Sequence, residues 1–178
     1  ASLGPDGKSE TGDEADIISM SLGFKSETDS TDPLSQAVNT AVERGSVVAV
    51  AAGNDGPELF TITSPGTAEK AFTVGASNKQ DYLPSHSGRG PTLDFRVKPD
   101  ILAPGVSITS SVPGGSYESW SGTSMATPHV AGASALLWQF LAEHSGEVSP
   151  QFIEDSLMCT TEDLGYNVYE QGSGRLDL

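Results

Sequence analysis

Short apolar runs alternate with polar turns in the first half of the chain. Asp16–Leu22 and Ser46–Ala52 are apolar runs rich in β-branched residues. Runs of this length without polar alternation are typical of strands buried on both faces. Between them, apolar residues recur at three- and four-residue spacing over Pro33–Arg44, with Asp32 before the proline and Gly45 after the run. This pattern predicts a capped helix, and therefore a βαβ unit with a parallel strand pair.

The second half of the chain predicts two more helices and further strands. Small residues followed by bulky apolar residues over Ser124–Glu143 predict a long, mostly buried helix, with Pro128 in its second turn. Ser149, followed by Pro150, is a typical N-cap of a short helix that ends at Met158. The other predicted strands are Ala71–Ala76, Val106–Ser111 and Gly174–Leu178, with a turn-rich stretch over Asn78–Pro104. Because no internal repeat or linker interrupts the chain, we expect one α/β domain.

Composition and charge exclude several classes of protein. The hydrophobic share of 36%, together with 20 glycines among 178 residues, is close to that of globular domains. Nine Lys and Arg against 24 Asp and Glu give a net charge of −15, which disfavours nucleic acids and membrane surfaces as partners. The apolar runs are too short for a membrane helix, and no signal-type segment opens these residues. The single cysteine, Cys159, excludes an intrachain disulfide.

Candidate chemistry centres on Ser124, in the segment Ser121–Gly132 (SGTSMATPHVAG). The glycine and threonine before Ser124 lead into the predicted helix, so this serine lies at the helix N-terminus. Unpaired backbone N–H groups and the positive end of the helix dipole favour a developing anion there. A helix cap is the alternative role for this serine taken alone. Because ligands bind beyond the carboxyl ends of parallel strands, Ser21-Leu22-Gly23 and Gly53-Asn54 should lie side by side at the same edge.

Three blocks, in this order along the chain, resemble the subtilisin-like serine proteases: DIISMSLG at Asp16–Gly23, AAGNDGP at Ala51–Pro57 and SGTSMATPHVAG. A further block, GRGPTLDFRVKPDILAPGV at Gly88–Val106, looks like the segment that leads to the catalytic serine of that family. The resemblance implies a three-layer α/β sandwich around a mostly parallel sheet. It also implies a secreted or cell-surface hydrolase that cleaves polypeptides, needs no cofactor for its chemistry and binds structural calcium.

The resemblance also implies a role for individual residues. Ser124 matches the nucleophile of the family, and Asn54 matches the asparagine whose amide completes the oxyanion hole. Ser21, Leu22 and Gly23 match the segment that pairs with the substrate backbone and helps to form the wall of the primary specificity pocket. Gly53 and the two alanines before it are expected to leave this pocket open to large apolar side chains.

The catalytic histidine and aspartate of the family have no match in the sequence. His129 follows Ser124 by five residues, which on a helix turns its side chain about 140° away, so we do not expect it to act as the base. The blocks of the family that read Asp-Ser/Thr-Gly and His-Gly-Thr-His precede the strand at Asp16 and do not occur here. We therefore interpret residues 1–178 as the C-terminal portion of a catalytic domain, with Ala1–Ala15 as a loop or cut edge. We expect this portion to be inactive alone, and its open sheet edge to favour self-association.

Two alternative functions come from different classes. In an α/β-hydrolase the nucleophile elbow would be Gly122–Ala126, but polar residues precede it, and no suitable acid lies between Ser124 and His144. That alternative is therefore disfavoured. A non-catalytic peptide-binding or structural module that keeps the cleft of the protease fold remains the alternative to an enzyme.

Overall fold

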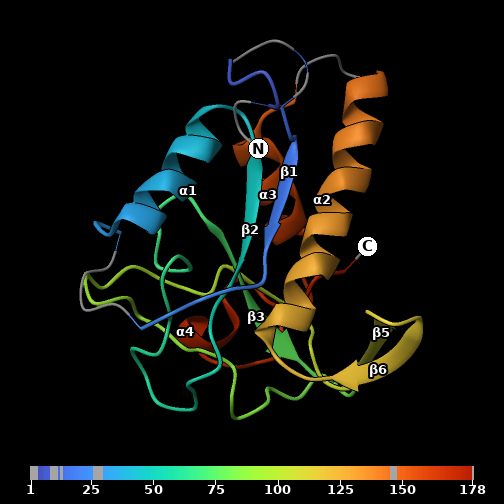
Figure 1. The fold of residues 1–178 in the computed structure, drawn as a ribbon. Coiled ribbons are helices and arrows are strands. Elements are labelled where there is room, and N and C mark those ends of the chain that lie inside the picture. The colour runs from blue at the N-terminus through green and yellow to red at the C-terminus, as the bar shows by residue number, and fades with distance from the viewer. Residues whose placement is uncertain (1–3, 9–11, 13, 26–29, 145–147, 178) are drawn as a thin grey trace.

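A parallel sheet of four strands forms the centre of the structure, with helices on both of its faces (Figure 1). The computed structural model describes residues 4–8, 12, 14–25, 30–144 and 148–177. The strands lie side by side in the order β1-β2-β3-β4, and each neighbouring pair is parallel. Their bounds are β1 (Ile17–Met20), β2 (Val47–Ala51), β3 (Phe72–Ser77) and β4 (Ile101–Pro104).

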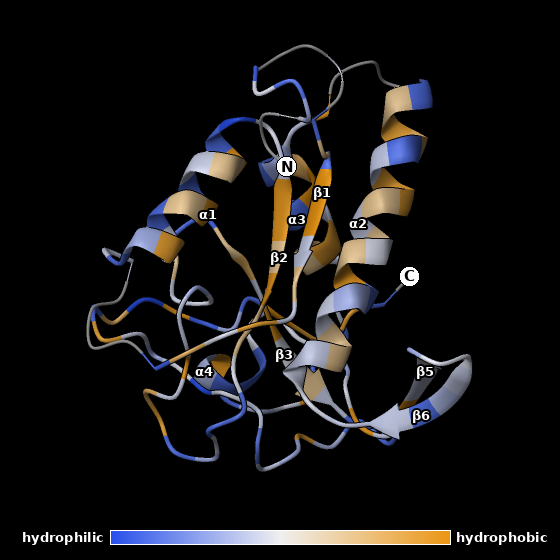
Figure 2. Ribbon diagram, in the orientation of Figure 1, coloured by the Kyte–Doolittle hydropathy of each residue, from blue (hydrophilic) through white to orange (hydrophobic). Residues whose placement is uncertain are grey.

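The two faces of the sheet are covered by different helices. Helix α1 (Pro33–Glu43) lies on one face, and α2 (Thr123–His144) and α3 (Pro150–Cys159) lie on the other. Alternate residues of β2 enter the two cores: Val47 and Ala49 pack with residues of α2 and α3, whereas Val48 packs with α1. Figure 2 shows β2 as a hydrophobic strand, which explains its uninterrupted apolar sequence. The predicted α/β architecture with a mostly parallel sheet is confirmed.

Capping residues fix where the predicted helices begin. The Asp32 carboxylate accepts hydrogen bonds from the backbone N–H groups of Leu34 and Ser35, both at 3.0 Å, so α1 begins at Pro33 as predicted. The Ser149 hydroxyl accepts the N–H of Phe152 and starts α3 in the same way. These side chains satisfy N–H groups that have no partner within the helix.

Four regions differ from the predictions. The stretch predicted to be rich in turns contains β4, which completes the parallel sheet. The strand predicted over Val106–Ser111 lies instead at β5 (Ile108–Val112), and it pairs with β6 (Ser116–Trp120) in a separate antiparallel hairpin.

Near the C-terminus, Arg175 forms only isolated bridges, and Leu178 lies outside the described residues. A one-turn helix, α4 (Val168–Gln171), was not predicted. Of the first 15 residues, those described (4–8, 12, 14 and 15) contain no helix or strand.

Candidate active site

The carboxyl ends of β1 and β2 meet the N-terminus of α2 at one end of the parallel sheet (Figure 1). Ser124, the second residue of α2, is half-buried there, and its Oγ lies 3.4 Å from the carbonyl oxygen of Ser21. The Ser124 backbone N–H has no hydrogen-bond acceptor among the residues that the structure describes. The predicted nucleophile therefore has a free N–H group beside its own hydroxyl.

Asn54 contacts the start of α2 through its side-chain oxygen. The Oδ1 atom accepts the backbone N–H of Thr123 at 2.9 Å and lies 3.2 Å from the hydroxyl of the same residue. Of the two polar atoms of the Asn54 amide, only the oxygen can accept a hydrogen bond, so this contact identifies the atom that faces Thr123 as Oδ1. The NH₂ group consequently faces away from Thr123, and Asn54 is exposed. Asn54 and Ser124 line the same cavity.

Thr123 joins the end of β2 to α2, a role that the sequence analysis missed. Its side chain is fully buried, and its Oγ1 lies 3.2 Å from both the N–H and the carbonyl oxygen of Gly53. A hydroxyl can accept from the first group and donate to the second or to Asn54. The one signal in the sequence is a threonine directly before the candidate nucleophile.

A second connection holds Ser124 to the end of β1. The Ser21 hydroxyl donates to the carbonyl oxygen of Ser124 at 2.7 Å. In an uninterrupted helix this carbonyl would accept the N–H of residue 128, but Pro128 has no N–H. Ser21 therefore satisfies an acceptor that the helix itself leaves open.

Ser124 lies between two cavities and lines both of them. On one side is a cavity of about 350 Å³, and the predicted substrate-binding residues Leu22, Gly23 and Gly53 line it. On the other side, a cavity of about 380 Å³ separates the β5–β6 hairpin from the first turns of α2. The Ser124 hydroxyl is thus accessible from cavities on both of its sides.

The His129 side chain hydrogen-bonds within its own helix. Its ring Nδ1 hydrogen-bonds the carbonyl oxygen of Met125 at 2.9 Å, and the residue is exposed. Within the described part of the chain, no histidine side chain hydrogen-bonds Ser124. The expectation from helix geometry that His129 is not the base agrees with this arrangement.

Comparison with known proteins shows to which family the chain belongs. Residues 6–174 match the subtilase family, Peptidase_S8. The chain belongs to the subtilase family. It is 41% identical over 185 residues to the serine protease AprX of Bacillus subtilis (strain 168), which covers 89% of this chain and 41% of AprX. It is 42% identical over 165 residues to subtilisin E of the same strain, covering 92% of this chain and 40% of subtilisin E. This subtilase chain thus spans less than half the length of either relative.

A solved structure supports the fold assignment. The prenylagaramide maturation protease PagA superimposes with a TM-score of 0.80 at 28% sequence identity, over 92% of this chain and 59% of that protein. The three-layer subtilisin-like α/β architecture is therefore shown for this subtilase chain.

Subtilases need no cofactor for their chemistry. The described residues contain no group of three or more His, Cys, Asp or Glu side chains arranged to hold a metal ion, and structural calcium stays a prediction. None of the described helices combines the length and the hydropathy that a membrane-spanning helix requires.

Proposed function

We propose that the protein is a serine endopeptidase in which Ser124 is the nucleophile. The supporting observation is the arrangement of two hydrogen-bond donors. The Oδ1 of Asn54 is held by Thr123, and among the described residues neither the Asn54 NH₂ group nor the Ser124 N–H has an acceptor, while both residues line the same cavity. Two free donors beside a serine hydroxyl are what an oxyanion hole requires.

The proposed reaction follows the acyl-enzyme route. Ser124 Oγ attacks the carbonyl carbon of the peptide bond while a base removes its proton, and the carbonyl oxygen becomes an anion that the two donors stabilise. The intermediate then expels the amine, which receives the proton, and leaves an acyl ester on Ser124. Water hydrolyses the ester by the same steps. We propose that the base and its orienting acid come from Asp and His blocks upstream of β1 in the complete protein, and that the 178 residues alone are inactive.

Substrate and setting belong to the same proposal. An extended polypeptide would lie along the two cavities and pair with the backbone of Ser21-Leu22-Gly23, which follows β1 and lines the cavity beside Ser124. A secreted or cell-surface enzyme with structural calcium is proposed on the family resemblance alone.

Labelling with a fluorophosphonate probe tests the proposal. The longer polypeptide with the upstream blocks should be labelled at Ser124, and Ser124→Ala should abolish both labelling and peptide cleavage without loss of folding. Ser121→Ala is the matched control, because Ser121 is an exposed serine three residues away whose Oγ accepts the Ser107 N–H at 2.9 Å. Absence of labelling in the longer polypeptide would favour a non-catalytic peptide-binding module. Strong labelling of the 178 residues alone would show that they contain a base.

A further inference from the structure

We infer that Thr63 closes the cavity beside Ser124 and restricts the substrate residue whose carbonyl is attacked, here called the acyl residue, to short side chains. The inference rests on the proposed function and adds a specificity-determining residue to it. Thr63 is 6% exposed and lines the 350 Å³ cavity together with Gly23, Gly53, Asn54 and Ser124.

The Thr63 side chain fills the space between the two walls of this cavity. One wall is the chain that follows β1, and the other is the chain that follows β2. A Cβ atom on Gly53 would lie 2.6 Å from Thr63 Oγ1 and 2.8 Å from its Cγ2, and a Cβ on Gly23 would overlap with the same hydroxyl. Each wall thus has a glycine next to Thr63, and the Thr63 side chain already occupies the gap between the two walls.

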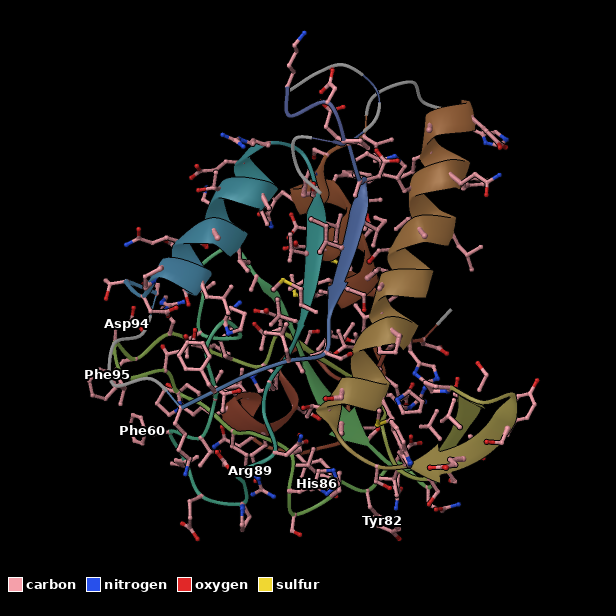
Figure 3. All side chains as sticks on the ribbon, viewed as in Figure 1. Phe60, Tyr82, His86, Arg89, Asp94 and Phe95 are labelled. Carbon is pink, nitrogen blue, oxygen red and sulfur yellow. The ribbon has the colours of Figure 1, made fainter. Side chains whose placement is uncertain are left out.

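A second cavity lies on the far side of Thr63. It measures about 470 Å³, and Phe60, Ile62 and Leu93 contribute its apolar lining. Phe60 stacks edge-to-face on Phe95 at a centroid distance of 6.0 Å, and Figure 3 shows the two rings close together among the loops. Three residues line both cavities: Lys25, Asp55 and Thr63. These three residues therefore form the partition between the cavities.

Thr63 is the fixed part of this partition. The Lys25–Asp55 ion pair spans 3.5 Å, and its side chains are 79% and 41% exposed, so solvent screens it and both side chains can move aside. Thr63, in contrast, is buried, and its backbone N–H donates to the carbonyl oxygen of Ala52 at 3.0 Å. The next residue, Ser64, forms a bridge with Phe24. A substrate side chain cannot displace a threonine held between two segments of the wall.

The consequence differs from the expectation based on the sequence. The small residues Ala51, Ala52 and Gly53 suggested a pocket open to large apolar side chains, but Thr63 comes from a loop ten residues further along the chain and occupies that room. On this inference, the end of the cavity that Thr63 closes takes a short side chain such as that of alanine or valine, whereas a phenylalanine ring would need the volume beyond the threonine.

Cleavage of peptide anilides that differ only at the acyl residue tests this inference in the full-length protein. The wild type should cleave after Ala or Val with a higher kcat/KM than after Phe. Thr63→Gly joins the two cavities and should raise the Phe-to-Ala ratio of kcat/KM by about tenfold or more, the discrimination that apolar pockets typically supply. Thr63→Val, which keeps the shape and loses the hydroxyl, should leave the ratio unchanged. Thr63→Ala provides a milder truncation if the glycine variant does not fold.

Thr67→Gly is the matched control. Thr67 is a buried threonine four residues further on, 4% exposed, and it lines neither cavity. Its removal should leave the Phe-to-Ala ratio unchanged. The inference is overturned if the wild type prefers Phe, or if the glycine and alanine variants at position 63 keep the wild-type ratio while still cleaving peptides. Failure of the wild type to cleave any peptide would overturn the proposed function, and this inference with it.

Discussion

A carboxyl group buried on α3 makes the stability of the protein depend on pH. Glu154 is 9% exposed, and its Oε1 has no hydrogen-bond partner within the described part of the chain. Burial raises the pKa of Glu154 to about 8, and the negative charge of Asp100 contributes to the rise. Lys98 offsets this only in part, because its Nζ is 2.7 Å from Asp100 Oδ2 and also donates to a backbone carbonyl. We predict that Glu154→Gln removes this pH dependence.

The direction in which stability changes with pH follows from the pKa of Glu154 in the unfolded chain and in the folded protein. In the unfolded chain Glu154 ionises near its ordinary pKa of 4.5, whereas in the folded protein it stays protonated up to about pH 8. The free energy of unfolding therefore has its full value below pH 4.5, falls as the pH rises and levels off above pH 8. At about 1.36 kcal/mol per pH unit, the interval from 4.5 to about 8 sets an upper limit of about 5 kcal/mol on the loss. Glutamine cannot ionise, so the variant lacks this loss.

Denaturant unfolding at pH 5 and pH 9 measures the effect, in a Ser124→Ala background that prevents self-cleavage. An unpaired glutamine amide costs about 1–3 kcal/mol at every pH, so the diagnostic quantity is the change with pH. Relative to its parent, Glu154→Gln should gain about 3–4 kcal/mol between pH 5 and pH 9. Glu143→Gln is the control, because it removes an exposed carboxylate that is not among the charges acting on Glu154, and it should show little of this gain. Parallel pH profiles for the parent and Glu154→Gln would refute the reasoning.

Two further predictions concern the hydrogen bonds around Ser124. Asn54→Ala should lower kcat by about 10²–10³ with little change in KM, which is the effect already measured for the corresponding amide of subtilisin. Asn54→Asp, which keeps an acceptor for the Thr123 N–H, should lose at least as much activity and retain stability; a loss confined to KM would contradict the assigned role. Ser21→Ala should lower kcat/KM about fivefold, since it leaves the Ser124 carbonyl without a donor. In a Pro128→Ala background the helix supplies an N–H and the effect of Ser21→Ala should vanish, whereas equal effects in both backgrounds would disprove the coupling.

Local signals explain which elements were predicted from the sequence. Helix α1 begins as predicted because Asp32 and Pro33 specify its start within a few neighbouring residues. Strand β4 was missed because its four residues, Ile101–Pro104, are too few to show a pattern beside the prolines around them. It becomes a strand by pairing with β3, about 27 residues earlier in the chain. Strand β6 is exposed along its whole length, so no burial pattern marks it.

In the candidate site, too, local sequence predicted some residues, whereas the contacts between distant segments could not be predicted. Ser124 and Asn54 were predicted because each lies in a short block with a recognisable sequence. The contacts that orient them join residues 69 or 103 positions apart, such as Asn54 with Thr123 and Ser21 with Ser124. No local pattern specifies such a pair, because it depends on how β1 and β2 are placed against α2. The same holds for the contacts of Thr63, which lies against glycines in two other segments.

Asn54 shows why this part of the fold and its chemistry depend on each other. Helix α2 begins with an N–H group that needs an acceptor, and the Oδ1 of Asn54, from the loop after β2, accepts it. The same contact leaves the NH₂ group of that amide facing away from Thr123, and Asn54 lines the same cavity as Ser124. Aspartate or serine would cap the helix as well as asparagine does, but neither can cap it through one atom and offer an N–H donor through another. If the proposed function holds, the residue type at position 54 follows from both demands together, whereas the stability of α2 alone would admit several residues.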